Sequence, residues 1–170
     1  LDGSDVTFNA PQDFNGSESF SVSVSDGEYT DSQNITVTVN AVNDAPVATT
    51  GLSGSTNEDQ SVVISLTGSD IDGDNLTFSL DSYASNGSVT LDGALATYAP
   101  DQDFNGDDSF SFTVSDGEYS SSAEVSVTIT AVNDAPVLAA VSDVSFDEDG
   151  SDQVSLSGSD VEQDALTFSI

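Results

Sequence analysis

The sequence predicts an all-β chain of antiparallel β-sandwich domains, each about 90 residues long and joined end to end. Two observations lead to this prediction. Several motifs recur at a constant offset of 90 residues, and within the repeat apolar residues alternate with polar ones. A period of two is typical of strands that bury one face, because successive side chains of a strand point to opposite faces of the sheet.

The repeat is visible in three motifs. "DFNG" begins at residues 13 and 103, "VSDGEY" at residues 24 and 114, and "AVNDAPV" at residues 41 and 131. Residues 1–43 share 24 identities with residues 91–133. We therefore predict three parts: the second half of a repeat over 1–43, a complete repeat over 44–133 and the first half of a further repeat over 134–170.

Within the complete repeat, strands are predicted at 61–68, 76–80 and 88–98, where Asp92 and Gly93 suit a tight hairpin turn. A longer hairpin is predicted over 109–130, around the sequence "DGE". About seven short strands with no helical segment favour a sandwich. The sequence Asn43-Asp44-Ala45-Pro46 is predicted to be a linker between repeats, because proline cannot continue a central strand.

The composition narrows the possible functions. The chain carries 31 acidic residues and no Lys, Arg or His, so its formal charge is −31. Leu, Ile, Val and Phe make up about a quarter of the residues, above the level of roughly 20% below which disorder is expected. Nucleic acid and anionic membranes are excluded as partners because both require basic residues. Without His, Lys, Arg or Cys, the chain is predicted not to be an enzyme.

The stretch "GSDIDGDNLTFSL" places Asp70, Asp72 and Asp74 at alternate positions before a strand. Two carboxylates about 4 Å apart repel by roughly 4 kcal/mol at an effective dielectric constant near 20, so a cation between them is favoured. Calcium takes oxygen ligands, the only protein ligands that this chain offers, whereas zinc prefers His and Cys. The stretch is not an EF-hand, because Asn75 stands where that loop requires glycine and strands are predicted on both sides.

The ordered set of motifs resembles the cadherin-like tandem repeats of large bacterial surface and secreted proteins, and "AVNDAPV" with "DFNG" and "VSDG" is similar to their RTX-type adhesin members. The resemblance covers the whole chain. It implies calcium ions at each junction between repeats, and it implies an extracellular structural segment. The partners would be neighbouring repeats of the same array or neighbouring copies in a filament.

The implied calcium ligands fall into two groups. The first junction would use Asp13, Asn43, Asp44, Asp70, Asp72 and Asp116, with Asp74 as an additional member. The second would use Glu58, Asp103, Asn133, Asp134, Asp160 and Glu162, with Asp59 and Asp164 as additional candidates. The chain departs from the family at Ala41, Ala131 and Asn105, where fewer oxygens are offered, so one or two ions per junction are expected. Glu162 and Gln163 in place of Asp72 and Gly73 predict that the two junctions differ.

Alternatives remain open at this point. The aspartates could be solvated turn residues at strand ends, and Asp26 and Asp116 could serve only their hairpin turns. A carbohydrate-binding module is the second functional hypothesis, with a surface polysaccharide as partner and Tyr83, Tyr98, Tyr29 and Tyr119 as candidate contacts. A third is a filament subunit in which residues 134–170 of one copy complete residues 1–43 of the next.

Overall fold

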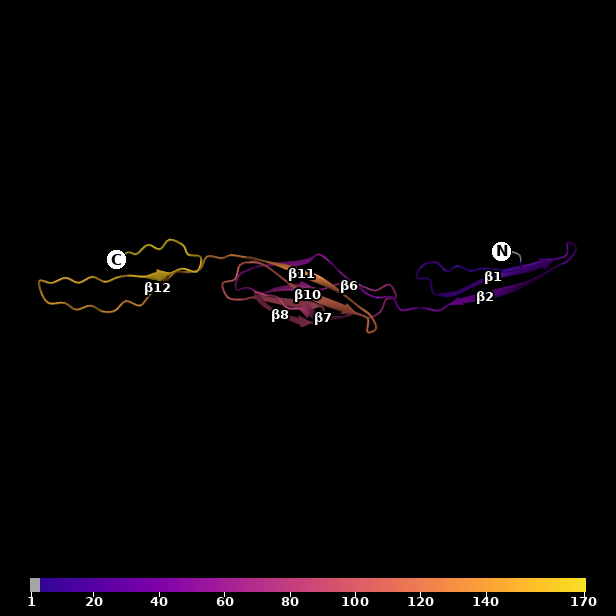
Figure 1. Cartoon of the computed structure of the whole chain (residues 1–170), viewed down its shortest axis with the longest axis horizontal. Coiled ribbons are helices and arrows are strands. Elements are labelled where there is room, and N and C mark those ends of the chain that lie inside the picture. Colours follow the sequence, from indigo (N-terminus) through magenta and orange to yellow (C-terminus); the bar gives the residue numbers. More distant parts are fainter. Residues whose placement is uncertain (1–3) are drawn as a thin grey trace.

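The computed structural model describes residues 4–170, and this part of the chain contains strands and no helix. Three segments follow one another along the long axis, with the β1 and β2 segment on one side of the middle segment and the β12 segment on the other (Figure 1). None of the described residues forms a helix able to span a membrane. The strands are β1 (Gly16–Ser25), β2 (Thr30–Val39), β3 (Val47–Ala48), β4 (Leu52–Asn57), β5 (Val62–Ser65), β6 (Gly68–Ser69), β7 (Thr77–Ser82), β8 (Gly87–Asp92), β9 (Leu95–Pro100), β10 (Gly106–Ser115), β11 (Ser120–Thr130), β12 (Val137–Leu138) and β13 (Gly158–Ser159).

The middle segment is a sandwich of two sheets. Strands β4, β11, β10 and β7 form one sheet in that order, and β5, β9 and β8 form the other. The short pair β3 and β6 lies beside them. This all-β, Ig-like arrangement of seven main strands confirms the fold class that the period of two predicts.

The hairpin of β10 and β11 supplies most of the core. Phe110, Phe112 and Val114 on β10 are buried, and so are Val125 and Val127 on β11. These residues alternate with polar ones along both strands, so one face of the hairpin packs against the second sheet while the other meets water. Burying an apolar side chain of this size is worth about 1.5–3 kcal/mol, which makes this hairpin the main source of stability.

Two details of the sandwich differ from the sequence predictions. The β8–β9 turn places Gly93 and Ala94 at its centre, one residue later than the predicted Asp92-Gly93, because Asp92 still pairs with Leu95. Strand β4 was not predicted, and it pairs with β11 in parallel rather than antiparallel. Its sequence lacks an apolar alternation because Gly54 faces inward, where a Cβ atom would lie 2.6 Å from Cδ1 of Ile64.

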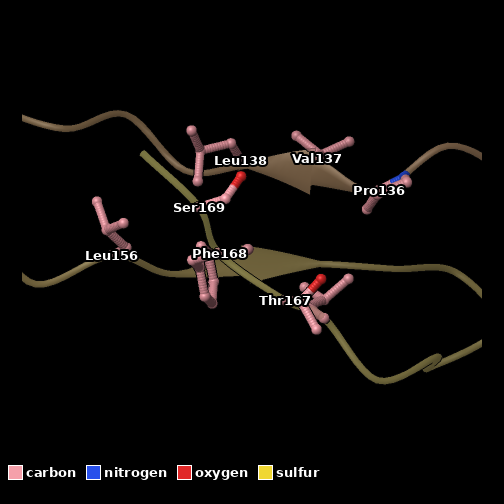
Figure 2. A pocket seen from close by; sticks show the side chains of 9 residues that line it. Pro136, Val137, Leu138, Leu156, Thr167, Phe168 and Ser169 are labelled. Carbon is pink, nitrogen blue, oxygen red and sulfur yellow. The ribbon is translucent and has the colours of Figure 1, made fainter.

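The two outer segments hold fewer strands. β1 and β2 form a two-stranded ribbon before the sandwich, and β12 and β13 form a short pair after it. Apolar side chains are exposed on both segments, including Val24 in the first and Leu138 and Phe168 in the second (Figure 2). The predicted boundaries of the three parts, at residues 43/44 and 133/134, stay a prediction.

Candidate metal centres

The second linker meets a buried carboxylate from the sandwich. Glu58 directly follows β4, and its backbone N–H donates to the carbonyl oxygen of Thr130 at 3.0 Å, which fixes it beside the end of β11. Its side chain is only 4% exposed. Oε1 accepts a hydrogen bond from the backbone N–H of Val132, whereas Oε2 is buried with no partner in the described part of the chain.

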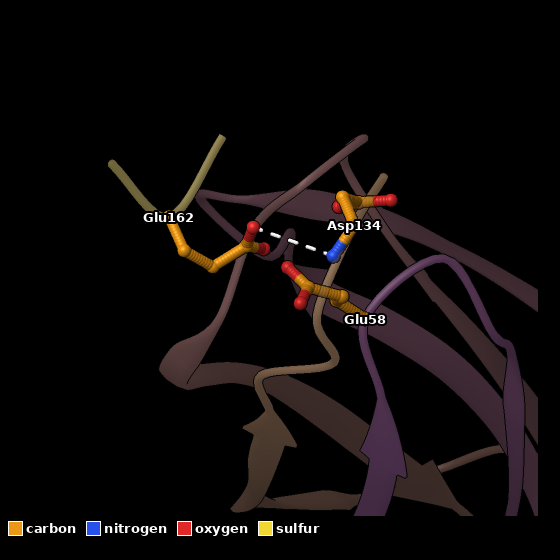
Figure 3. Close-up of side chains that lie close together, drawn as sticks. All are labelled: Glu58, Asp134 and Glu162. Atoms are coloured by element: carbon orange, nitrogen blue, oxygen red, sulfur yellow. Dashed lines mark hydrogen bonds between the residues drawn. The ribbon is translucent and has the colours of Figure 1, made fainter. Parts of the chain in front are cut away.

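Two further acids complete this group. Asp134 lies in the linker and Glu162 in the segment that follows it, and the backbone N–H of Asp134 donates to Oε2 of Glu162 at 3.3 Å (Figure 3). One carboxylate oxygen from each of Glu58, Asp134 and Glu162 lies within 4.8 Å of the others. Oδ2 of Asp134 and Oε1 of Glu162 are also buried and have no hydrogen-bond partner among the described residues.

A second group shares Asp134 with the first. Oxygens of Asp59, Asp103 and Asp134 lie within 4.8 Å of one another, and the backbone N–H of Asp103 donates to Oδ1 of Asp59 at 3.2 Å. Asp59 and Asp103 both have positive φ angles, 59° and 57°, a conformation that aspartate tolerates better than most residues. The five acids of these two groups are here called the linker-2 cluster.

The linker-2 cluster is electrostatically unfavourable by itself. Burial raises the pKa of Asp134, and the negative charges of Glu162, Asp103, Asp59 and Glu58 raise it further. No basic side chain exists anywhere in the sequence to offset this repulsion. The cluster therefore has the chemistry of a cation site: several carboxylate oxygens converge, and three of them have no hydrogen-bond donor in the part of the chain that the structure describes.

Around the first linker, Asp70 organises a loop. Its Oδ1 accepts hydrogen bonds from the backbone N–H groups of Asp72, Gly73 and Asp74 at 2.9, 3.1 and 3.3 Å. Its Oδ2 is buried with no partner in the described chain. Oxygens of Asp70, Asp72 and Asp74 lie within 4.8 Å of one another, and this group is here called the linker-1 cluster.

The linker itself contacts the sandwich at two points. The backbone N–H of Asp44 donates to Oδ2 of Asp72 at 2.8 Å, and the side-chain amide of Asn43 donates to Oδ2 of Asp116 at 2.9 Å. Asp116 also accepts from the N–H groups of Glu118 and Tyr119, both at 2.7 Å. The bond from Tyr119 is the main cause of its lowered pKa, and Asn43 adds to it against an opposing effect of burial. Asp116 thus serves its turn and also contacts the linker.

Other predicted ligands are less closely placed. Among residues 4–170, Asp13 belongs to no group of three or more converging acids, and neither does Asp160 or Asp164. Oδ1 of Asp160 accepts from the backbone N–H of Asp164 at 3.0 Å, as Asp70 does from Asp74. The side chain of Asn133 donates to the carbonyl oxygen of Asp134 at 2.9 Å. Their role as calcium ligands stays a prediction.

Sequence reasoning did not predict that Asp134 would belong to two groups at once. Asp59 was predicted as an additional ligand of the same junction as Glu58, and the structure places the two residues in different groups that meet through Asp134. Glu58 and Asp59 lie in the turn that follows β4, and the positive φ angle of Asp59 turns the chain between them, so the two carboxylates reach different neighbours. The signal was present in the adjacent acids, but the sequence does not show where the linker passes between them.

The two packed sheets of the middle segment define an all-β protein with an Ig-like sandwich. Residues 43–130 match the family model described as the bacterial Ig domain, and the chain belongs to that family. No curated protein matches the chain by sequence.

Several solved structures are similar in part. An endo-fucoidan hydrolase from glycoside hydrolase family 107 shares 24% identity at a TM-score of 0.43, over 69% of this chain and 19% of that protein. Drosophila N-cadherin EC1-3 shares 14% identity at a TM-score of 0.41, over 61% and 41%. Titin domain M7 shares 17% identity at a TM-score of 0.32, over 54% and 99%. The chain thus spans about a fifth of the length of the hydrolase.

Proposed function

We propose that this chain is a calcium-stiffened structural segment of an extracellular bacterial adhesin or surface filament, without catalytic activity. The observation that carries the proposal is the linker-2 cluster. There, the buried oxygen Oε2 of Glu58 lies beside Asp134 and Glu162 and has no hydrogen-bond donor among residues 4–170. Because Glu58 comes from the sandwich, Asp134 from the linker and Glu162 from the next segment, a cation held there would join all three.

Calcium fits this donor set better than other common metals. The available ligands are carboxylate, amide and backbone oxygens, which suit a hard cation that accepts six to eight ligands in a flexible geometry. Magnesium requires a stricter octahedral arrangement, and zinc prefers the nitrogen and sulfur ligands that the chain lacks. The linker-1 cluster offers the same chemistry through Asp70, whose Oδ2 has no donor in the described chain.

Metal binding would change the mechanics of the chain. Without a cation, the like charges of the linker-2 cluster repel and favour conformations in which the linker moves away from the sandwich. With a cation, the free energy of binding stabilises the arrangement that brings the three segments together. The sites need only be weak, because extracellular calcium modules bind in roughly the 10⁻⁴ to 10⁻³ M range.

The family supports an extracellular setting, since bacterial Ig domains are commonly extracellular. The adhesin context and the calcium ions rest on the motifs of the sequence and on the acidic clusters. The proposed partners are neighbouring repeats or neighbouring copies. The remaining negative charge would keep adjacent chains apart in solution.

Small-angle scattering and thermal unfolding test this proposal, at a concentration where the chain is monomeric. We expect a chelator to lower the unfolding temperature and to shorten the maximum dimension relative to millimolar calcium. The double variant Glu58→Gln with Asp134→Asn should behave in calcium as the unsubstituted chain behaves in chelator. The matched control, Asp92→Asn with Glu124→Gln, removes two exposed acids outside both clusters and should retain the calcium response. Identical scattering and unfolding with and without calcium would contradict the proposal.

Carbohydrate binding is the second candidate, and one observation favours it. Tyr83 follows β7 and is 74% exposed, as a sugar-stacking ring must be. Tyr98, a candidate in the sequence analysis, is fully buried and cannot contact a ligand, so that prediction was wrong. Binding of an acidic or neutral polysaccharide that is lost in Tyr83→Ala and kept in Tyr119→Ala would support this function.

A further inference from the structure

Asparagine is followed by glycine at three places in the chain, at residues 15–16, 86–87 and 105–106. Such a pair can deamidate without an enzyme, because glycine has no Cβ atom to hinder its backbone nitrogen. That nitrogen attacks Cγ of the asparagine side chain, a five-membered succinimide ring forms and ammonia leaves. Water then opens the ring and gives either aspartate or isoaspartate. The three pairs are chemically alike, so the fold decides which of them react.

Ring closure requires a particular movement of the backbone. The glycine nitrogen must turn towards the asparagine side chain by rotation about ψ of the asparagine. The carbonyl oxygen of the asparagine turns with it, because the peptide unit is planar. Hydrogen bonds to that oxygen, or close packing around the glycine, therefore oppose the reaction. Both features can be compared at residues 86–87 and 105–106, which lie in the middle sandwich.

Hydrogen bonds hold the backbone of Asn86 on both sides. Its N–H donates to Oδ2 of Asp108 at 2.8 Å. Its carbonyl oxygen accepts two hydrogen bonds, from the backbone N–H of Asp101 at 2.9 Å and from the hydroxyl of Tyr98 at 3.3 Å. Rotation of the peptide unit between Asn86 and Gly87 would break both of the bonds to the carbonyl oxygen.

Gly87 is also closely packed. It is the first residue of β8 and pairs with Pro100 of β9. A Cβ atom at Gly87 would lie 2.5 Å from the carbonyl oxygen of Ala99 and 2.9 Å from Cζ of Tyr98. Because these atoms leave so little room, the backbone nitrogen of Gly87 cannot approach the side chain of Asn86 unless β9 moves.

The second pair, Asn105 and Gly106, is much less constrained. Both residues are exposed, and Asn105 lies between a turn and the first residue of β10. Apart from its chain neighbours, the nearest atom to a Cβ atom at Gly106 would be Cζ of Phe104 at 3.7 Å, an ordinary contact distance. Outside the strand ladders, no backbone hydrogen bond among residues 4–170 involves Asn105. The two features that oppose ring closure at Asn86 therefore do not act at Asn105.

The motif "DFNG" sets this backbone geometry wherever it occurs. The φ angle is 128° at Gly106 and 129° at Gly16. A Cβ atom at Gly16 would lie 3.8 Å from Cζ of Phe14, much as at the later position. Residues with a Cβ atom rarely adopt such φ angles, so the motif requires glycine at this position. The structural need for glycine thus keeps the reactive pair in place.

We propose that Asn105 is a site of spontaneous deamidation in the folded chain, whereas the fold protects Asn86. Each product carries a new negative charge, and isoaspartate also lengthens the backbone by one carbon atom. Asp103 of the linker-2 cluster is two residues away, so the two Cα atoms lie within about 7 Å of each other. That distance is shorter than the Debye length of about 8 Å at physiological salt, so the new charge adds to the repulsion within the cluster. The inference goes beyond the proposed function, because the reaction needs no metal ion.

Peptide mapping by mass spectrometry tests the proposal on the 170-residue chain, aged at neutral pH in chelator. Trypsin has no site in a chain without Lys and Arg, but chymotrypsin, which cleaves after aromatic residues and leucine, separates the two pairs into peptides 84–91 and 105–110. The product is detected by the mass change when OH replaces NH2. In denaturant the two pairs should react at similar rates. In the folded chain Asn86 should react more slowly than Asn105, by about tenfold or more, because two hydrogen bonds must break first.

Two variants test the cause of the difference. Tyr98→Phe removes one hydrogen bond to the carbonyl oxygen of Asn86 and keeps the buried ring, so it should raise the rate at Asn86 and leave the rate at Asn105 unchanged. Asn105→Gln is the control at the exposed site, since glutamine would have to form a six-membered ring, and its product should be nearly absent. Thermal unfolding confirms that both variants are folded.

Equal rates at Asn86 and Asn105 in the folded chain would overturn the proposal. So would a folded chain in which Asn105 stays intact while it reacts in denaturant. Asn105→Asp reproduces the aspartate product and tests the effect of its charge. In chelator it should unfold at a lower temperature than Asn105→Gln, and added salt should reduce the difference. Equal unfolding temperatures would show that the new charge does not act on the linker-2 cluster.

Discussion

The backbone N–H of Asp44 donates a hydrogen bond to Oδ2 of Asp72 at 2.8 Å, which ties the first linker to the loop before β7. The same bond recurs 90 residues later, from Asp134 to Oε2 of Glu162 at 3.3 Å. Glu162 stands where the middle segment has Asp72, and the hydrogen bond to the linker is kept. In both places a backbone-to-carboxylate hydrogen bond therefore ties the linker to the acidic loop beside it.

Replacing Asp72 separates this bond from metal binding. In chelator, Asp72→Ala should lower the stability of the middle sandwich by about 1 kcal/mol, the usual net value of one hydrogen bond. Asp72→Asn keeps an acceptor oxygen for Asp44 and should change stability in chelator by less. In calcium both variants should bind the ion more weakly, because both lose a carboxylate.

Thermal unfolding in chelator, with Asp92→Ala as the exposed control, measures the difference. Equal losses for Asp72→Ala and Asp72→Asn would show that the charge of Asp72, and not its bond to Asp44, determines stability.

Glu58→Gln should change stability in opposite directions with and without calcium. In chelator, the substitution removes one charge from the linker-2 cluster and keeps Oε1 as the acceptor for Val132, so the unfolding temperature should rise. In calcium, it removes a ligand charge, and the affinity should fall on the order of tenfold or more.

Calorimetric titration measures the calcium affinity, and Glu124→Gln on the exposed face of β11 is the matched control. An unfolding temperature that falls in both solutions would mean that the Glu58 carboxylate is stabilised by contacts within the protein.

Gly73 and Gln163 occupy equivalent positions with φ angles of 81° and 63°. Glycine adopts this conformation freely, whereas a residue with a Cβ atom loses roughly 1–2 kcal/mol there. A Cβ atom on Gly73 would meet no atom within 4 Å, so Gly73→Gln should destabilise the sandwich by conformation alone, by about 1 kcal/mol. Chemical denaturation checks this, and Gly73→Asn should lose less because asparagine tolerates positive φ. An equal loss of stability in Gly73→Gln and Gly73→Asn would mean that the positive φ angle is not the cause of the loss.

The sequence predicted those strands and acidic groups that a single regular pattern determines. The β10–β11 hairpin was predictable because both strands alternate strictly, and the acidic groups were predictable because their aspartates recur at the repeat offset. Strand β4 was not, because its inward position 54 is a glycine fitted to Ile64, a contact that only packing shows. Likewise, Asp107 and Asp108 are adjacent and chemically identical, and only the folded chain shows that Asp108 alone contacts the β7–β8 loop.

Asp108 holds that loop through several hydrogen bonds. Its carboxylate accepts from the backbone N–H groups of Ser85 and Asn86 at 3.1 and 2.8 Å, and from the hydroxyl of Tyr98 at 3.0 Å. Burial alone would raise the pKa of Asp108, but these bonds, with one from the N–H of Ser109, outweigh it and lower the pKa. Burial and the bond to Asp108 raise the pKa of Tyr98, so its hydroxyl remains a donor at neutral pH.

The lowered pKa of Asp108 gives the sandwich a pH dependence of known sign. The unfolded chain binds a proton on this residue near pH 3.9, and the folded chain does so only at lower pH. The contribution of Asp108 is therefore fully present above that range and is lost as the pH falls through the folded-state pKa. Asp108→Asn should destabilise the sandwich at pH 7 by about 1–3 kcal/mol and flatten the acid limb of the stability profile. Denaturation across pH 2–7 in chelator measures this, with Asp107→Asn as the adjacent control; an unchanged acid limb in Asp108→Asn would mean that other carboxylates determine it.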